Sequence, residues 1–160
     1  MDTRPTSDRV REAAFSLIGP VDGAAVLDLF AGSGAMGLEA LSRGAASCVF
    51  VETDREALRA IDRNLEKLQF AGVAVVRLDA LAALATDAAA GRRYDLVLLD
   101  PPYGKLSKLV PALSAYLPAV LSDAGLVVFE SEASEEPELP LAQRTTRRYG
   151  STRLTLFEHE

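Results

Sequence analysis

Short apolar runs alternate with helical patterns along this chain, and this alternation restricts the possible folds more than any other feature. The runs occupy residues 24–30, 47–52, 73–78, 94–100 and 125–130. Each run is continuously apolar, which is typical of parallel strands that are covered on both faces. Because parallel strands are joined by right-handed crossovers, we expect an α/β fold with a doubly wound, mostly parallel sheet whose ligands bind beyond the carboxyl ends of the strands.

Helices are expected before the first strand and between the strands. The first spans residues 7–18, with Ser7 as its N-cap and Gly19 as its stop. Another is marked by a capping box, formed by Thr53 and Glu56 ahead of an apolar row at helical spacing. The remaining helices are expected at residues 35–43, about 80–90 and about 106–121.

The end of the chain departs from this alternation. The segment TRRYGSTRLTLFE joins two extended pieces through Tyr149-Gly150-Ser151, which predicts an antiparallel hairpin. Added to the five parallel strands, the hairpin gives a seven-stranded sheet. We expect a single domain over residues 1–160, with its core in residues 24–160.

Composition limits the function classes. With 160 residues, 49% of them hydrophobic and 25% charged, the chain is too apolar for disorder and has the right size for one core. Its apolar runs are too short to span a membrane and no signal-like segment opens it, so we expect a cytoplasmic protein without a membrane partner. Cys48 and His159 are the only cysteine and histidine, so neither a disulfide nor a metal site is expected.

Charge bears on nucleic-acid partners. The net charge of −6 argues against a protein that coats nucleic acid nonspecifically, because such binding rests on phosphate neutralisation. Local basic clusters remain candidates for contact with nucleic acid, although each also fits an ordinary solvated surface. They lie near the N-terminus (Arg4, Arg9 and Arg11), after the fourth strand (Lys105 and Lys108) and near the C-terminus (Arg144, Arg147, Arg148 and Arg153).

A glycine-rich turn follows the first apolar run, in DLFAGSGAMG at residues 28–37. Gly32, Gly34 and Gly37 match the G-x-G-x-x-G pattern that lets a backbone approach a nucleotide closely, although glycines also serve ordinary tight turns. Asp28 lies late in the apolar strand, where a carboxylate is costly unless it meets a partner. An ammonium group or a set of N–H donors would be such a partner.

Further acids follow the next two strands. Glu52 or Asp54, in FVETD, is placed to accept the hydroxyl groups of a ribose, which NAD and S-adenosylmethionine share. Asp79, in VRLDAL, is placed either to meet an adenine amino group or to act as the N-cap of the following helix. These acids therefore do not choose between the two cofactors.

The fourth strand ends on Asp100-Pro101-Pro102-Tyr103, at the edge where this fold places its substrate. The two prolines fix the backbone and hold its carbonyl groups rigid. The Asp100 carboxylate and the Pro101 carbonyl are suited to accept the two hydrogens of an exocyclic amino group on a base, while Tyr103 stacks on its ring. An ordinary strand stop explains the prolines but not the acid at the end of LVLL.

Three segments resemble motifs of Rossmann-type S-adenosylmethionine-dependent methyltransferases that act on amino groups, namely DLFAGSGAMGLEALSRGA, FVETDR and VLLDPPYGK. A fourth, RPTSDRVREAAFSLI, resembles the N-terminal signature of the RsmD family, which methylates guanine N2 in 16S rRNA of the small ribosomal subunit. The resemblance covers essentially the whole chain. It implies S-adenosyl-L-methionine as the cofactor, 16S rRNA as the partner, and a monomer.

The resemblance also implies roles for individual residues. Asp100, Pro101, Pro102 and Tyr103 would form the catalytic strand end that holds the guanine amino group. The cofactor-binding residues would be Asp28, Phe30, Ala31, Gly32, Ser33, Gly34, Glu52, Thr53, Asp79, Ala80 and Asp100. The residues that contact substrate RNA would be Arg4, Thr6, Arg9, Arg11, Lys105, Arg147 and Arg148.

One departure from the family concerns the N-terminus. Family members usually carry a basic β-hairpin ahead of the Arg-Pro-Thr signature, and this chain starts almost at that signature. We therefore expect the usual hairpin to be absent from this chain, either because the sequence is truncated or because this member has lost an RNA-binding element. Full activity is then less expected of this form, while cofactor binding is less affected.

We expect methyl transfer by in-line displacement, in which guanine N2 attacks the sulfonium methyl group and Asp100 or water takes the proton. Three alternatives stay open. A DNA adenine or cytosine amino-methyltransferase shares the Asp-Pro-Pro-Tyr motif but usually carries a recognition domain for which this chain has no length. An NAD-dependent oxidoreductase would explain the glycines and Glu52 but gives Asp100 and Tyr103 no role. A noncatalytic RNA-binding module would bind RNA without turnover.

Overall fold

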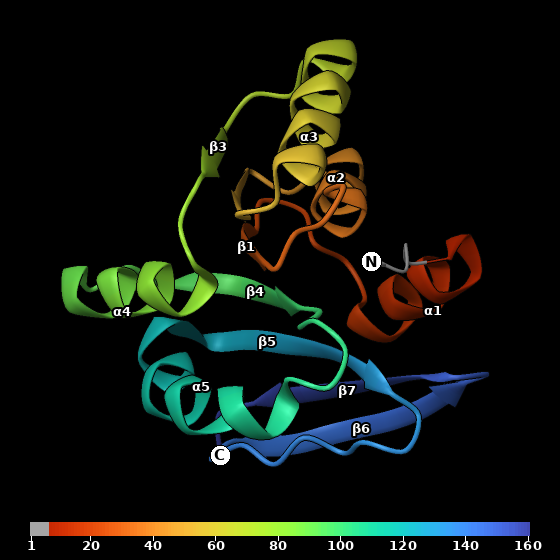
Figure 1. Ribbon diagram of the computed structural model, residues 1–160, viewed down its shortest axis with the longest axis vertical. Coiled ribbons are helices and arrows are strands. Elements are labelled where there is room, and N and C mark those ends of the chain that lie inside the picture. Colours follow the sequence, from red (N-terminus) through yellow and green to blue (C-terminus); the bar gives the residue numbers. More distant parts are fainter. Residues whose placement is uncertain (1–6) are drawn as a thin grey trace.

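The computed structural model describes residues 7–160, and its centre is one seven-stranded sheet (Figure 1). The strands are Ala25–Leu29 (β1), Ser47–Val51 (β2), Val73–Val76 (β3), Tyr94–Leu99 (β4), Leu121–Glu132 (β5), Ala142–Tyr149 (β6) and Thr152–Glu158 (β7). They lie in the order β3-β2-β1-β4-β5-β7-β6, with β1 to β5 parallel and β6 and β7 antiparallel. The prediction of a doubly wound, mostly parallel α/β sheet with a C-terminal antiparallel hairpin is confirmed.

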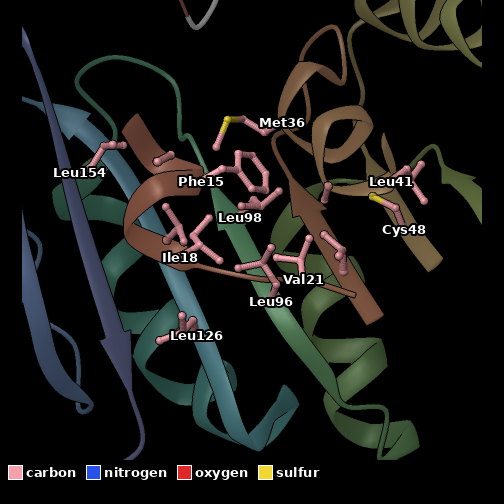
Figure 2. Packing of buried hydrophobic residues seen from close by; sticks show 14 of the residues in the cluster. Phe15, Ile18, Val21, Met36, Leu41, Cys48, Leu96, Leu98, Leu126 and Leu154 are labelled. Carbon is pink, nitrogen blue, oxygen red and sulfur yellow. The ribbon is translucent and has the colours of Figure 1, made fainter. Parts of the chain in front are cut away.

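Helices cover both faces of the sheet, which explains why the strands are continuously apolar. They are Asp8–Ile18 (α1), Ala35–Ser42 (α2), Arg55–Leu68 (α3), Ala80–Ala90 (α4) and Leu106–Val120 (α5). The first three pack on the face that carries Val26 and Leu98, part of the core in Figure 2. Helices α4 and α5 pack on the other face, against Leu27 and Leu99. Neighbouring residues of a strand thus point into different cores. Full burial of one such apolar side chain contributes about 1.5–3 kcal/mol to the stability of the fold.

The first helix begins and ends as its sequence predicts. Ser7 Oγ accepts a hydrogen bond from the Val10 N–H at 3.2 Å, which caps α1. The helix stops at Gly19, whose N–H donates to the Phe15 carbonyl and whose φ of 84° lies in the region that favours glycine. Because α1 is amphipathic, with Val10 and Phe15 buried, its apolar side packs onto the sheet.

The capping box predicted for α3 is wrong. The N-cap is Asp54, whose Oδ2 accepts from the Ala57 N–H at 2.9 Å. The Thr53 N–H donates instead to Glu52 Oε2 at 2.9 Å, so Thr53 lies in the turn that leaves β2 and Glu56 falls inside the first turn of the helix. Aspartate is as favourable an N-cap as serine, so the neighbouring residue takes the position.

The pairing register brings the predicted site together at one edge of the sheet. Leu29 at the end of β1 pairs with Val51 on one side and with Leu99 on the other. The residues that follow, Phe30, Glu52 and Asp100, therefore leave three adjacent strands at the same level. Strand β1 lies at the point where the strand order reverses, which is where ligands bind in sheets of this type.

The C-terminal hairpin extends beyond this edge (Figure 1). Because Phe129 pairs with Leu99, Glu130 of β5 is level with Asp100. The β5 pairing with β7 continues to Glu132, about 7 Å further along the strand, and the predicted turn through Gly150 lies past it. The hairpin tip therefore stands next to the edge at which Asp100 emerges.

Within residues 7–160, no helix combines the length and the apolar character needed to cross a membrane.

Candidate active site

The turn between β1 and α2 is a tight backbone loop. Phe30, Gly32 and Gly34 have φ angles of 57°, 58° and 83°. The Ala31 N–H donates to the Val51 carbonyl at 3.0 Å, and the Gly34 N–H donates to the Ala31 carbonyl at 2.8 Å. A left-handed conformation at Phe30 costs about 1–3 kcal/mol, so the surrounding hydrogen bonds must hold it in place. The loop thus presents backbone rather than bulky side chains at the carboxyl end of β1.

The third glycine of the motif has a packing role. A Cβ atom on Gly37 would lie 2.5 Å from Phe50 Cε1, 2.8 Å from Cys48 Sγ and 2.9 Å from Asp28 Oδ2. These distances leave no room for any larger residue. Gly37 therefore lets α2 lie directly against β1 and β2 and fixes the position of the loop that precedes it.

Asp28 is a buried carboxyl group at the centre of the site. Its exposed fraction is 4%, and its Oδ2 accepts from the Gly37 N–H at 3.0 Å. Burial raises the pKa of the Asp28 carboxyl from 3.8 to about 8; the Gly37 hydrogen bond opposes this, while the charges of Glu52 and Glu130 add to it. A cation bound beside Asp28 would favour its ionised form, so the position suits an ammonium or sulfonium group.

Glu52 ties the glycine loop to the end of β2. Its Oε1 accepts from the Gly32 N–H at 2.7 Å, and its Oε2 accepts from the N–H groups of Thr53 and Asp54, both at 2.9 Å. A carboxylate offers about four acceptor sites, so three are used here and one remains for a hydroxyl donor. Of the two acids considered for the ribose, Asp54 caps α3, which leaves Glu52 as the candidate.

Asp79 is the N-cap of α4. Its Oδ2 accepts from the Leu81 N–H at 3.1 Å and from the Ala82 N–H at 3.2 Å. The structural alternative considered for this residue is therefore correct. Ala80 is buried at the start of the helix. Contact of either residue with an adenine stays a prediction.

The Asp-Pro-Pro-Tyr segment leaves β4 as an exposed turn. Asp100 and Pro101 are half-buried, whereas Pro102 is exposed and Tyr103 has an exposed fraction of 77%. The Lys105 N–H donates to the Pro102 carbonyl at 3.2 Å and closes the turn ahead of α5. Most of the Tyr103 side chain therefore faces solvent, where aromatic rings in nucleic-acid-binding proteins stack on bases.

The basic residues predicted to contact RNA lie in different surroundings. Arg147 and Arg148 are exposed near the hairpin tip, and Arg9 and Lys105 are exposed at α1 and the start of α5. Arg11 instead bridges α1 to α2, since its Nε lies 3.1 Å from Glu39 Oε1; its Nη2 also pairs with Asp8 of α1. We therefore leave Arg11 out of the proposed RNA surface. Arg4 and Thr6 lie outside the described residues.

Glu130 is a site residue that the sequence predictions missed. It is 8% exposed, level with Asp100 on the next strand, and close enough to Asp28 for its charge to raise the pKa of that group. By strand alternation it shares a face with Val128, which packs in the same core as Leu98. The sequence does contain a sign of Glu130, because the apolar run GLVVFE ends in this acid in the same way that YDLVLLD ends in Asp100.

Neither a metal site nor a separate surface hollow competes with this assignment. Among residues 7–160, no three His, Cys, Asp or Glu side chains are placed to hold a metal ion together. A surface hollow of about 410 Å³ lies at the opposite edge of the sheet, beside Asp95 and Leu126, and contains none of the motif residues. We therefore place the candidate active site at the carboxyl edge of β1, β2 and β4.

Comparison with known proteins identifies the family of the chain. The sequence profile of the family described as "Conserved hypothetical protein 95" matches residues 1–158. The chain is 39% identical to "Putative rRNA methyltransferase YlbH" of Bacillus subtilis (strain 168), with 98% of this chain and 88% of that protein aligned. It is 41% identical to "Ribosomal RNA small subunit methyltransferase D" of Escherichia coli (strain K12), with 81% of this chain aligned and 64% of that enzyme spanned.

The fold is shared with solved structures. "Putative methyltransferase yhhF from Escherichia coli" superimposes with a TM-score of 0.85 at 34% identity, covering 96% of this chain and 87% of that one. An RNA methyltransferase from Salinibacter ruber, solved in complex with S-adenosyl-L-homocysteine, has the same fold at 20% identity, with a TM-score of 0.73 over 98% of this chain and 95% of that one. The chain therefore belongs to the Conserved hypothetical protein 95 family, the RsmD family that its motifs indicated.

Proposed function

We propose that this protein is an S-adenosylmethionine-dependent rRNA methyltransferase that modifies the exocyclic N2 of a guanine in 16S rRNA of the small ribosomal subunit. One observation carries the proposal: the Asp100–Tyr103 turn leaves β4 level with the glycine loop of β1 and with Glu52 of β2. An amine-binding turn thus adjoins a nucleotide-binding loop. The names of the aligned relatives, which refer to rRNA and to its small subunit, support the same substrate.

The residues present fit S-adenosylmethionine. The methionine ammonium group supplies a cation that favours the ionised form of the buried Asp28 carboxyl. At Gly32 no atom lies within 4 Å of where a Cβ would stand, so the loop backbone is open to a ligand there, whereas Gly34 is packed against Ile61 and Phe50 and shapes the turn. The remaining acceptor site of Glu52 takes a ribose hydroxyl. We assign Asp79 and the start of α4 to the adenine end of the cofactor. Phe30, Ala31, Ser33, Thr53 and Ala80 complete the binding surface. Bound here, the cofactor supplies an electrophilic methyl group on a sulfonium.

The β4 turn positions the substrate amine. The Asp100 carboxylate and the Pro101 carbonyl accept the two N2 hydrogens, and Pro102 keeps that carbonyl fixed. Tyr103 stacks on the guanine ring, a contact worth about 1–3 kcal/mol. Alignment of this kind lowers a barrier by up to roughly 7–11 kcal/mol, so no strong base is required. Asp100 or water accepts the proton that N2 loses as its bond to carbon forms.

RNA is held by local basic groups, since the chain as a whole carries a net charge of −6. Arg147 and Arg148 stand on the hairpin that extends past the level of Asp100, Lys105 is exposed in the β4 turn, and Arg9 is exposed on α1. Arg4 and Thr6, outside the described residues, complete the proposed substrate surface.

The test is transfer of a labelled methyl group from S-adenosylmethionine. Wild-type protein and Asp100→Ala are incubated separately with small ribosomal subunits, free 16S rRNA and genomic DNA. We expect label in rRNA with wild type only, while calorimetry shows that both proteins still bind the cofactor. Label confined to DNA would favour an adenine or cytosine amino-methyltransferase, and undiminished transfer by Asp100→Ala would remove the role given to Asp100.

A further inference from the structure

A second hollow lies on the surface of α3, beside the exit from β3. Its volume is about 210 Å³, and it is lined by Arg55, Leu58, Arg59, Asp62 and Arg77. Leu58 is buried and forms the apolar base, whereas the four charged residues are exposed. None of these residues belongs to the methyl-transfer site described above.

The charges in this hollow are unbalanced. Arg77 Nη2 lies 3.2 Å from Asp62 Oδ2, so one arginine is paired with the single carboxylate. Within residues 7–160, Arg55 and Arg59 form no ion pair. These two guanidinium groups therefore have no carboxylate partner in the described part of the chain, and an anion can bind them.

The positions of these arginines are unfavourable for the helix itself. Arg55 is the first residue of α3, where the helix dipole is positive and a cation costs about 0.3–1 kcal/mol. Arg59 lies four residues later, and like charges at this spacing cost a further 0.2–0.5 kcal/mol or so. An anion bound between them would reverse both effects, because it would meet two guanidinium groups at the positive end of a helix.

One lining residue of the hollow, Arg77, lies at the same edge of the sheet as the candidate active site. Val76 at the end of β3 pairs with Val51, so Arg77 is level with Glu52. Strands β3 and β4 are separated by three strand spacings. The backbone at Arg77, after β3, therefore lies about 14 Å from the backbone at Asp100, after β4. The centre of the edge is acidic, with Glu52 and Asp100 at the ends of β2 and β4, and repels phosphate groups. RNA phosphates are therefore best accommodated at the two flanks, of which the hairpin arginines occupy one.

We propose that the hollow formed by Arg55, Arg59 and Arg77 binds a backbone phosphate of the substrate RNA, on the β3 side of the target guanine. This inference rests on the proposed function, because it takes the RNA to be bound at the carboxyl edge. The phosphodiester is recognised by its charge and by guanidinium hydrogen bonds, so the interaction adds affinity and orientation without reading sequence.

The experiment measures binding of 16S rRNA to the full chain at a series of KCl concentrations, without cofactor. The test variant is Arg55→Gln combined with Arg59→Gln, since glutamine keeps a polar side chain and removes the charge. Arg63→Gln is the matched control: it is exposed on the same helix, one turn beyond Arg59, and does not line the hollow. Cofactor affinity is measured by calorimetry for every protein.

We expect the double variant to bind rRNA several-fold more weakly than wild type, with a plot of log K against log salt that is shallower by about 0.7 for each phosphate that the variant no longer neutralises. The control should keep the wild-type slope, and all proteins should bind S-adenosylmethionine equally. A wild-type slope in the double variant, or an equal change in Arg63→Gln, overturns the inference. So does a double variant that loses affinity for inorganic phosphate yet keeps its rRNA slope.

This outcome is separable from a failure of the proposed function. A wild-type protein that transfers no methyl group to rRNA contradicts the proposed activity, whatever the slopes. A wild-type protein that methylates guanine, together with a double variant whose salt dependence is unchanged, contradicts only the role of Arg55 and Arg59.

Discussion

The buried Asp28 carboxyl makes the stability of the cofactor-free protein depend on pH. In the fold it keeps its proton up to about pH 8, whereas in the unfolded chain it loses that proton near its ordinary pKa of 3.8. Asp28→Asn replaces it with an uncharged group of the same shape, whose oxygen still accepts from the Gly37 N–H. The comparison therefore removes the titration and keeps the packing.

The sign and size of the effect follow from the raised pKa. The native state holds a proton that the unfolded state has lost, so the contribution of Asp28 to stability is complete below about pH 4 and declines until about pH 8. At 1.36 kcal/mol for each pH unit, the whole interval corresponds to roughly 6 kcal/mol. Between pH 5 and pH 8 the Asn variant should thus gain about 4 kcal/mol relative to wild type.

Urea denaturation of both proteins at pH 5, 6, 7 and 8 measures this difference, and groups common to both cancel. A difference in unfolding free energy that stays constant over this range would refute the reasoning about Asp28. Cofactor binding gives the complementary result: ionised Asp28 binds the cation, so affinity should rise with pH towards about 8 in wild type and lose that dependence in Asp28→Asn.

Three other substitutions test separate parts of the site. Gly37→Ala places a methyl group 2.5 Å from Phe50 Cε1, so we expect a loss of about 1–3 kcal/mol in unfolding free energy by urea titration; an unchanged value would contradict the packing role. Glu52→Gln puts an amide N–H where Oε1 or Oε2 now accepts a hydrogen bond, so we expect a lower melting temperature and weaker S-adenosylmethionine binding in calorimetry. A variant with normal cofactor affinity would exclude Glu52 from the cofactor site. Tyr103→Ala should change the unfolding free energy by less than about 0.5 kcal/mol, because the side chain is exposed. It should lower kcat/KM for rRNA by roughly 5- to 150-fold, the effect of losing about 1–3 kcal/mol of stacking. Equal kcat/KM values for the variant and wild type would show that the ring does not stack on the substrate.

Much of the fold was predictable because its signals are local. Continuous apolar runs marked the strands, and glycine stops at Gly19 and Gly91 marked the ends of helices, as observed. Strand β5 is longer than predicted, since it begins at Leu121 rather than near Gly125. At the start of β5, Leu121 pairs with Tyr94 of β4, and the register shifts before the next pair. The polar residues that follow Leu121 do not predict a strand, so this extension depends on pairing with β4.

The parts of the site that escaped prediction depend on contacts between distant segments. The Gly32 N–H meets Glu52, and only the register of β1 and β2 brings them together. The same holds for Glu130 and for the arginine hollow, whose members come from α3 and from the residue after β3. The sequence shows which strands end in an acid. It does not show that these acids lie at the same edge of the sheet, because that depends on the order and pairing of the strands.

The central claim is that the β4 turn delivers a guanine N2 to the methyl donor. The most direct measurement digests 16S rRNA after incubation with the protein and S-adenosylmethionine and identifies the modified nucleoside by mass spectrometry. We predict N2-methylguanosine at a single position with wild type and none with Asp100→Ala. A methyl group on another atom or another base, or no modified nucleoside in the rRNA, would contradict the account.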